Sequence, residues 1–502
     1  MFKVNPLLCT DGYKTSHHLM YPQGTQLVFS NFTPRSVKYM PKQAQEIVVF
    51  GIQYTMMYIN DLFKENFFSR DKQEVCQELQ KHLNSYLGAT YNISHFEALY
   101  DLGYLPVEVR ALEEGTIIEP KIPILTIHNT LPEFYWLTNF LETLISTTLW
   151  KPMHSASMSY AYNKAVRKYA KETDENNLPF TMFQCHDFSM RGMQSLESAI
   201  ASGLGFLVCS SGTDTLPTLQ ASEYYYGTSD VAFSVPASEH AVMTAYGKEN
   251  EIDSFSRILD LFPTGIVSMV SDQFDLWKVL TEFLPQLKDK IMSREGKAVF
   301  RPDSGDPADI LCGLNTRKDK TFSSEEIKSP AYKGVIELLW EVFGGTTNEQ
   351  GFKVLDSHVG AIYGDSITLD RVEEICDRLK EKGFASTNVV FGVGSYSMGY
   401  ATRDNQGSAV KATYIEKEIE VHGRNLGGRK EIVGVEIFKD PITDDGTKKS
   451  AKGLLAVFGG KLKDQCTWQE VISEENELKP FFKDGNFLRI TTLTEIRQRL
   501  NG

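Results

Sequence analysis

An arginine and an aspartate follow a short apolar run and stand two positions apart. Arg301 and Asp303 belong to the segment FRPDSGDP at residues 300–307, where Pro and Gly indicate a turn after the run. Arginine suits phosphate because its guanidinium is planar and permanently charged. Asp303 can accept hydrogen bonds from sugar hydroxyls or hold Mg²⁺, which prefers carboxylate and phosphate oxygens. The segment therefore indicates a site for a phosphate and a sugar; the alternative is a salt-bridged surface turn.

A glycine-rich segment, GVGSYSMG at residues 392–399, follows the last apolar run. Backbone N–H groups around Gly394 and Ser395 can face a phosphate there, although a tight turn would use the same residues. The spacing is not G-x-G-x-x-G, so a Rossmann site is not indicated. The sequence also lacks G-x-x-x-x-G-K-[ST], which excludes a P-loop nucleotidase.

Two histidines, His186 and His240, each lie at or just after the end of an apolar run. A single histidine is more often a packed core residue or a surface residue than a reactive one. Asp272 follows a later run and could orient a histidine ring and raise its basicity. The histidines and aspartates do not have the spacing of a zinc site, and no G-x-S-x-G elbow is present.

An aromatic residue and an arginine share another turn, with Phe188 and Arg191 in the segment DFSMRG at residues 187–192. An aromatic face with a guanidinium beside it can hold a flat heterocycle. Asp214, in GTDT at residues 212–215, adds an acceptor. A carboxylate only accepts hydrogen bonds, so it selects a ligand that offers N–H donors. The combination favours an amide over an acid.

Several basic residues lie outside these turns: Arg403, Lys411 and Lys439 toward the C-terminus, and Arg35 and Lys38 near the N-terminus. A small polyanionic substrate would account for a basic cluster in an acidic chain. Scattered surface charge is the alternative for any single one of them.

These residues must be positioned by a regular scaffold. Seven short apolar runs end in small or charged residues between about residues 180 and 400, and most are followed by a helical pattern. The runs end in the segments 183–188, 206–214, 232–236, 266–272, 298–303, 361–365 and 389–394. Buried strands that alternate with helices predict a parallel sheet. We expect an α/β fold with an incomplete (β/α) barrel, whose active site lies at the carboxyl ends of the strands.

One helix of this scaffold can be read in detail. Leu369, Val372, Ile375 and Leu379 form an apolar stripe at helical spacing, and Gly383 suits the position after the helix. A similar pattern covers residues 274–291.

The flanking segments differ from the barrel. Residues 105–128 and 408–460 read as antiparallel strands and predict a second, mixed and mostly β domain built from both ends of the chain. We expect an N-terminal α+β segment over residues 1–150, which also contributes to a dimer interface. The barrel follows over residues 151–400, and a β-rich segment over residues 401–502 completes the second domain. A helix over residues 133–150 is apolar nearly all round, so it lies in the core or at a subunit interface.

Composition limits the partners. The chain has 502 residues and a formal charge of −13, which disfavours nucleic acid and anionic membranes. Its seven cysteines have no C-x-x-C pair, which argues against a disulfide framework and favours a reducing, cytoplasmic setting. The first residues do not resemble a signal peptide, and no apolar run approaches the ~20 residues that span a bilayer.

Taken in order, the motifs resemble those of the nicotinamide phosphoribosyltransferases, within the type II phosphoribosyltransferase family. The matching segments are TDGYK at 10–14, YWLTN at 135–139, HDFSMRG at 186–192, GTDT at 212–215, SVPASEH at 234–240, SD at 271–272, RPDSG at 301–305, GD at 364–365 and FKDP at 438–441. The resemblance covers nearly the whole chain. It implies that nicotinamide and phosphoribosyl pyrophosphate give nicotinamide mononucleotide and pyrophosphate, with Mg²⁺, in a homodimer with shared active sites.

The resemblance also implies a role for each site residue. Phe188 would stack on the pyridine ring, with the partner subunit contributing Tyr13 on the other face, and Asp214 would accept the carboxamide N–H. Arg191 and Arg301 would meet phosphate groups, and Asp303 the ribose hydroxyls. His240 would be the histidine phosphorylated by ATP, supported by Asp272. Further substrate contacts are implied for Ser234, Ser268, Gly364, Asp365, Gly394 and Ser395 and, from the neighbouring subunit, for Arg35, Arg403, Lys411 and Lys439. No metal ligands are identified.

Three positions depart from the family pattern: Gly12 replaces a serine, and Ser189 and Ser395 each replace a glycine. The nearest alternative is a nicotinate phosphoribosyltransferase, which Asp214 disfavours because it would repel a carboxylate. A non-catalytic dimeric binding protein on the same scaffold is a more distant one. A type I phosphoribosyltransferase is disfavoured, because Asp444 and Asp445 do not follow an apolar strand.

Overall fold

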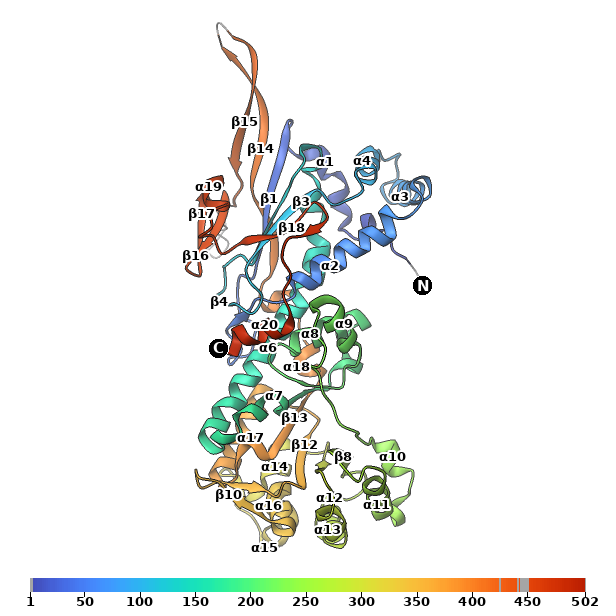
Figure 1. Cartoon of the computed structure of the whole chain (residues 1–502), viewed down its shortest axis with the longest axis vertical. Coiled ribbons are helices and arrows are strands. Elements are labelled where there is room, and N and C mark those ends of the chain that lie inside the picture. Colours follow the sequence, from blue (N-terminus) through green and yellow to red (C-terminus); the bar gives the residue numbers. More distant parts are fainter. Residues whose placement is uncertain (1–2, 424–425, 440–441, 443–450, 502) are drawn as a thin grey trace. The chain divides into compact units, whose positions relative to one another are not determined.

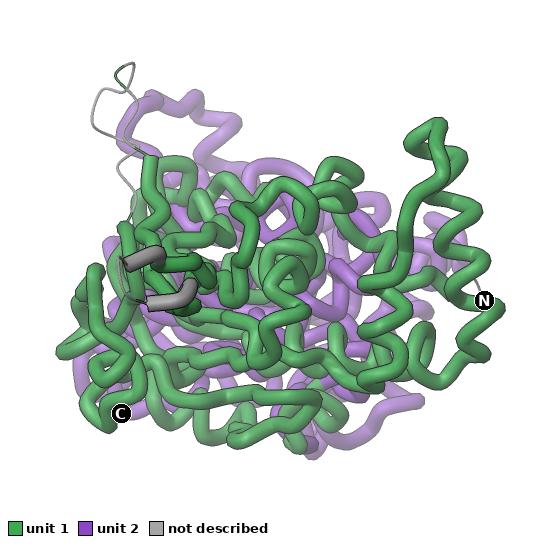
Figure 2. Tube along the Cα trace, turned by 90° about the horizontal axis from the view of Figure 1, so that it is seen from above, with its two compact units in different colours: residues 1–154, 222–228, 402–502 green, residues 155–221, 229–401 purple. Residues whose placement is uncertain are grey.

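The computed structural model describes residues 3–423, 426–439, 442 and 451–501. The chain divides into two compact units, each assembled from segments that are distant in the sequence (Figure 2). Unit 1 contains residues 1–154, 222–228 and 402–502, and unit 2 contains residues 155–221 and 229–401.

Unit 2 is built on a parallel sheet of six strands in the order β7-β6-β13-β12-β9-β8. Residues such as Val267, Met269 and Ile362 are buried, as expected where helices cover a parallel sheet. The strands are β6 (Cys185–Asp187), β7 (Gly212–Thr213), β8 (Val267–Val270), β9 (Ala298–Arg301), β12 (Val359–Tyr363) and β13 (Val389–Val393).

The sheet curves toward closure through residues 233–237. This segment makes one parallel bridge to each edge strand, from Phe233 to Gly212 of β7 and from Ala237 to Ser268 of β8. The predicted strand at 232–236 is thus reduced to two bridges, and Pro236 has no N–H to add to a ladder. The expected incomplete barrel is confirmed.

One predicted strand is shorter and lies later in the sequence than expected. The apolar run at 206–209 is not extended, because helix α8 (Leu196–Phe206) reaches into it and β7 begins only at Gly212. Leu207, Val208 and Cys209 are nevertheless buried. A short apolar run is the same in a buried strand and at the end of a buried helix, so the pattern could not separate them.

Helices follow most strands of unit 2 (Figure 1). The predicted stripe of α17 (Leu369–Glu381) is confirmed, since Leu369, Val372, Ile375 and Leu379 are all buried. Gly383 follows the end of that helix in a left-handed conformation, with φ of 78°. The other helices are α7 (Thr181–Gln184), α9 (Pro217–Tyr226), α10 (His240–Thr244), α11 (Glu251–Leu261), α12 (Leu276–Lys278), α13 (Leu284–Met292), α14 (Pro307–Cys312), α15 (Ser324–Lys328), α16 (Pro330–Phe343) and α18 (Ser395–Gly399).

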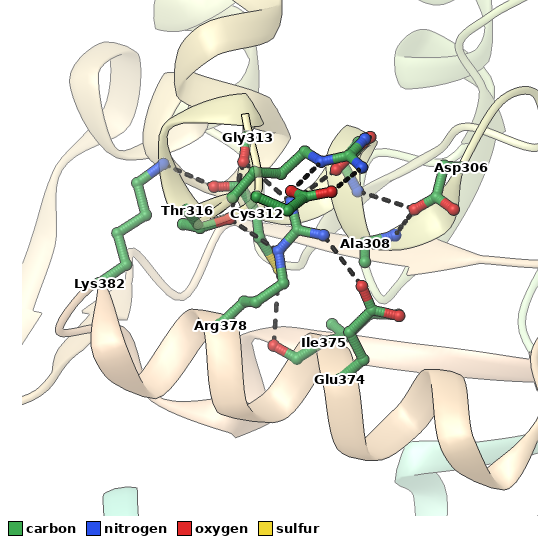
Figure 3. A network of polar contacts seen from close by, with 12 residues as sticks. Asp306, Ala308, Cys312, Gly313, Thr316, Glu374, Ile375, Arg378 and Lys382 are labelled. Atoms are coloured by element: carbon green, nitrogen blue, oxygen red, sulfur yellow. Dashed lines mark hydrogen bonds and ion pairs between the residues drawn. The ribbon is translucent and has the colours of Figure 1, made fainter. Parts of the chain in front are cut away.

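A polar network joins α17 to α14, the helix that follows β9 (Figure 3). The Arg378 guanidinium donates to Thr316 Oγ1 at 2.7 Å and to the Gly313 carbonyl at 3.1 Å. Asp306 caps α14 by accepting from the Ala308 N–H at 3.0 Å. These bonds hold the helix directly after the turn that carries Asp303.

Unit 1 is built on an antiparallel sheet in the order β15-β14-β1-β5-β3-β18-β19. Its strands come from both ends of the chain, which confirms the second, mostly β domain. They are β1 (Thr25–Thr33), β3 (Val107–Ala111), β5 (Leu125–Asn129), β14 (Ala409–Gly423), β15 (Leu426–Glu436), β18 (Lys479–Lys483) and β19 (Asn486–Phe487). Two smaller sheets pair β2 (Ile47–Val48) with β4 (Ile117–Ile118) and β16 (Leu454–Phe458) with β17 (Lys461–Cys466).

The predicted helix at 133–150 is interrupted. It consists of a 3₁₀ turn at Pro132–Phe134, α5 (Leu137–Phe140) and the start of α6 (Glu142–Thr173). Trp136, Phe140 and Ile145 are buried in the core of unit 1, so the apolar face is accounted for within the chain. The remaining helices are α1 (His17–Met20), α2 (Ile52–Phe63), α3 (Lys72–Leu87), α4 (Ser94–Leu102), α19 (Trp468–Val471) and α20 (Leu493–Asn501). No helix among the described residues is long and apolar enough to cross a membrane.

Candidate active site

The carboxyl ends of the unit 2 strands open into a cavity of about 1350 Å³. Many side chains that the sequence singled out line it, although they come from turns far apart in the chain. The cavity brings together Phe188, Arg191, Asp214, His240, Arg301, Asp303, Gly364, Asp365, Gly394 and Ser395.

A buried carboxylate joins the first two of these turns. Asp187, at the end of β6, is 1% exposed and accepts from the Ser189 N–H and hydroxyl at 2.9 and 2.6 Å. Its other oxygen accepts from the Thr215 hydroxyl at 2.8 Å. The Asp214 N–H donates to the Asp187 carbonyl at 3.0 Å. The turn after β6 and the turn after β7 are therefore fixed to each other, and Ser189 takes part in the link.

The Phe188 ring lies on glycine backbone from two neighbouring strands. A Cβ atom added to Gly392 would lie 2.3 Å from the ring, and one added to Gly364 would lie 3.1 Å from it. The Phe188 N–H donates to the Val393 carbonyl at 3.0 Å. Larger residues at these glycines would displace the ring. Held in this place by the two strands, the Phe188 ring forms one wall for a flat ligand, which we call the aromatic wall.

Asp214 lies beside this aromatic wall and accepts two hydrogen bonds on one oxygen. Ser234 Oγ donates to Asp214 Oδ1 at 2.6 Å, and His186 Nε2 lies 3.1 Å from the same atom. Burial by itself raises the pKa of Asp214, but these bonds and the charges of His186 and Arg301 outweigh it and lower the pKa below its ordinary value. Asp214 therefore stays ionised and accepts hydrogen bonds near neutral pH.

A second, mainly apolar cavity of about 360 Å³ shares Phe188, Asp214 and Arg301 with the first. Ser234 and Ser268 line it. It adjoins the aromatic wall and has room for a small flat ring.

Asp303 is a half-buried carboxylate of the site, with one oxygen left without a donor in the part of the chain that the structure describes. Its Oδ2 lies 3.5 Å from Arg301 Nε, while its Oδ1 is buried without a hydrogen-bond donor among the described residues. Burial raises the pKa of Asp303, and the charges of the Asp272 and Asp365 carboxylates raise it further. Arg301 and His240 lower it, but the pKa remains above its ordinary value. A buried acceptor without a donor is suited to a ligand hydroxyl or a cation.

His240 and Asp272 form the pair that the sequence suggested. His240 Nε2 lies 3.3 Å from Asp272 Oδ1, and Asp272 Oδ2 accepts from the Asp303 N–H at 2.9 Å. The histidine side chain is 48% exposed and that of the aspartate 5% exposed. The buried carboxylate thus orients a ring that remains accessible from the cavity.

The other predicted binding residues belong to unit 1. Tyr13 lies on a 3₁₀ turn at Gly12–Ser16 and is 64% exposed. Burial lowers the pKa of Lys411, and the nearby charges of Arg35 and Lys439 lower it further. Arg35 and Lys439 are thus close enough to Lys411 for their charges to act on it, while Arg403 pairs with Asp404 at 3.5 Å. Within the FKDP motif, Asp440 and Pro441 lie outside the described residues.

Comparison with known proteins identifies the family. The model described as the nicotinate phosphoribosyltransferase (NAPRTase) family matches residues 183–486, and the model of the nicotinamide phosphoribosyltransferase N-terminal domain matches residues 5–109. The chain belongs to the nicotinate phosphoribosyltransferase family. It is therefore a phosphoribosyltransferase, and the resemblance noted in its sequence is confirmed.

Its relatives differ in how similar their sequences are to this chain. The nicotinamide phosphoribosyltransferase of Acinetobacter baylyi is 44% identical, over 99% of this chain and 97% of the relative. That of Mycoplasma pneumoniae is 34% identical, over 90% and 97%. Among solved structures, nicotinate-nucleotide pyrophosphorylase from Pyrococcus furiosus aligns with a TM-score of 0.55 and 15% identity, covering 100% of this chain and 96% of the other. Human nicotinic acid phosphoribosyltransferase aligns with a TM-score of 0.50 and 14% identity, over 98% and 93%. These two structures support the fold of the phosphoribosyltransferase.

Two residues of this site did not stand out in the sequence as site residues. His186 was visible only as one histidine among others, and Asp187 only as part of a motif. Their importance comes from contacts with Asp214 and Thr215 on the next strand, and residue spacing along one chain does not report such contacts.

Asp303 supports a prediction on stability and pH. Its folded-state pKa lies above the ordinary value, so the folded protein loses stability as pH rises through the range between the two. Asp303→Asn removes that loss. We expect the variant to melt at the same or a higher temperature than the wild type at pH 7, with the two converging below pH ~4. Its kcat/KM should fall by about 10- to 100-fold, since a charged hydrogen-bond acceptor is lost. A variant less stable than the wild type at pH 7 would contradict the assignment.

Proposed function

We propose that this phosphoribosyltransferase transfers the phosphoribosyl group of phosphoribosyl pyrophosphate to nicotinamide, in salvage of NAD. The products are nicotinamide mononucleotide and pyrophosphate. The observation that carries the choice of substrate is Asp214, an ionised acceptor at the edge of an aromatic wall. A carboxamide offers it an N–H, whereas the carboxylate of nicotinate would be repelled.

The residues of the cavity suit this displacement. The pyridine nitrogen forms a bond to the anomeric carbon of the sugar as the bond from that carbon to the pyrophosphate oxygen breaks. The transition state resembles an oxocarbenium ion and needs positioning and charge neutralisation more than a nucleophile of the enzyme. Phe188 stacks on the ring, Arg191 and Arg301 neutralise phosphate groups, and Asp303 accepts from the ribose hydroxyls. Gly364, Asp365, Gly394 and Ser395 line the 5′-phosphate side.

Mg²⁺ fits this site as a partner of the diphosphate. No three His, Cys, Asp or Glu side chains converge on one point within the described part of the chain. Mg²⁺ needs only one or two carboxylates when substrate phosphates complete its shell. Asp303, whose Oδ1 lacks a donor, would hold it, with Asp365 nearby. The ion would neutralise the charge that develops on the leaving pyrophosphate.

The test of the function is a coupled pyrophosphate assay with nicotinamide and with nicotinate. The wild type should prefer nicotinamide. In Asp214→Asn, use of nicotinamide should fall by about 10- to 100-fold, because a charge-assisted hydrogen bond is lost, and the preference should shrink. Asp356→Asn is the matched control, since Asp356 also pairs with a histidine in unit 2 but does not line the cavity. An unchanged ratio in Asp214→Asn would refute the role of this carboxylate.

We further propose a homodimer in which each active site is shared. The support is that Tyr13 is exposed and that the charges of Arg35 and Lys439 act on Lys411, a repulsion that an anionic substrate would relieve. Tyr13→Ala and Arg301→Ala chains should each be inactive alone. After subunit exchange, the mixture should regain activity, because one site of each heterodimer is intact. No recovery after confirmed exchange would mean that each chain builds its own site.

ATP is proposed as a third substrate, which phosphorylates His240. The ring is exposed and oriented by Asp272, and a phosphohistidine would add negative charge beside the diphosphate site. His240→Ala should abolish ATP hydrolysis and its stimulation of the reaction, while slow ATP-independent product formation remains. Hydrolysis of ATP by the variant in step with product formation would exclude His240 as the acceptor.

A cytoplasmic location is also proposed. None of the seven cysteines, all of which are described, forms a disulfide, and six are buried, which suits a reducing compartment.

A further inference from the structure

We propose that His186 is a positioning residue that holds Asp214 in the orientation that selects a ring bearing an amide. This inference rests on the proposed function and adds to it a second residue that determines specificity.

The carboxylate of Asp214 needs to be held. Its side chain is 46% exposed, and the terminal torsion of a free aspartate is broad. Ser234 and His186 both approach Oδ1, at 2.6 and 3.1 Å, and they come from different places in the barrel. Among the described residues none donates to Oδ2. With Oδ1 occupied from two directions, Oδ2 is the oxygen left for the amide N–H of a ligand.

His186 is itself held firmly, which makes it the reference point of this group. Its side chain is only 12% exposed. It lies on β6, which pairs with Gly212 of β7 on one side and with Gly392 of β13 on the other. Its ring centroid lies 5.1 Å from that of Phe188. His186 therefore contacts both Asp214 and Phe188 and fixes their positions relative to each other.

Space for the imidazole depends on a glycine. A Cβ atom added to Gly212 would lie 2.6 Å from His186 Nδ1. Gly212 is part of a strand without a left-handed φ, so its backbone also suits alanine. Alanine at this position would displace the ring, and its Cβ would also lie 3.1 Å from the Cys185 carbonyl, while the side chains of His186 and Asp214 stay unchanged.

Ser234 alone gives a weaker constraint. It lies on residues 233–237, which hold the barrel through only two single bridges. A hydroxyl can also rotate to follow a moving acceptor. The ring N–H of His186 has a fixed direction, so it restricts the orientation of the Asp214 carboxylate. The Ser234 hydroxyl can rotate and would keep its hydrogen bond if the carboxylate turned. We therefore expect His186 to contribute more than Ser234 to the choice between amide and acid.

The experiment measures kcat and KM for nicotinamide, nicotinate and phosphoribosyl pyrophosphate in His186→Ala, His186→Gln and Gly212→Ala. The alanine variant of His186 should raise KM for nicotinamide about tenfold, leave kcat and KM for phosphoribosyl pyrophosphate within about twofold, and reduce the preference over nicotinate. His186→Gln keeps an N–H donor and should restore most of the preference. Gly212→Ala should reproduce the loss with the imidazole still present. His358→Ala is the matched control. His358 Nδ1 lies 2.6 Å from Asp356 Oδ1, and neither residue lines the cavity.

The outcomes separate this inference from the function on which it rests. Unchanged selectivity in both His186→Ala and Gly212→Ala would overturn it. So would a loss of kcat and of affinity for both substrates together in His186→Ala and in His186→Gln, since that would indicate a structural role. If His186→Ala does not fold, the result for Gly212→Ala decides. A wild type that forms no nicotinamide mononucleotide would refute the proposed function instead.

Discussion

Asp187 is buried at the end of β6, and both of its carboxylate oxygens are occupied by donors from the turns that follow β6 and β7. Leaving a buried carboxylate without donors costs free energy, so these three donors stabilise Asp187 in its place. Phe188 follows Asp187 directly, and the Asp214 N–H donates to the Asp187 carbonyl. Phe188 and Asp214 thus keep their spacing because of one buried carboxylate, whose two oxygens are both bonded within the protein.

Much of this arrangement could be predicted from the sequence. Parallel strands bring their carboxyl ends to one edge, so the polar residues at the ends of the segments 298–303 and 206–214 had to meet once the barrel was inferred. That logic places Arg301, Asp303 and Asp214 in one cavity without any coordinates. The stripe of α17 could be predicted for the same kind of reason, since a helical period is visible along one continuous segment.

What could not be predicted depends on contacts between strands. A Cβ atom on Gly392 would lie 2.3 Å from the Phe188 ring and one on Gly212 would lie 2.6 Å from His186 Nδ1, and nothing in either local sequence specifies these close approaches. The prediction of a strand at 206–209 is wrong for a related reason, because a short apolar run is equally buried at the end of a helix and in a strand. The pairing of β1 with β14 brings Lys411 to the end of β1 that precedes Arg35, which is a long-range event. Local patterns determine the elements, and long-range packing determines which residues within them become functional.

The pairing of β1 with β14 also orders the events of biosynthesis. Asn31 bonds to Lys411, 380 positions later. At translation rates of about 5–20 residues per second, that interval lasts roughly 20–80 s. Every segment of unit 2 is complete by residue 401, whereas the sheet of unit 1 still lacks β14, β15, β18 and β19 at that point. The barrel can therefore fold while the ribosome is still working, and β1 waits with one edge unpaired, the state in which strands are most prone to aggregate. The nascent chain completes its catalytic unit first, and the unit that carries Tyr13 last.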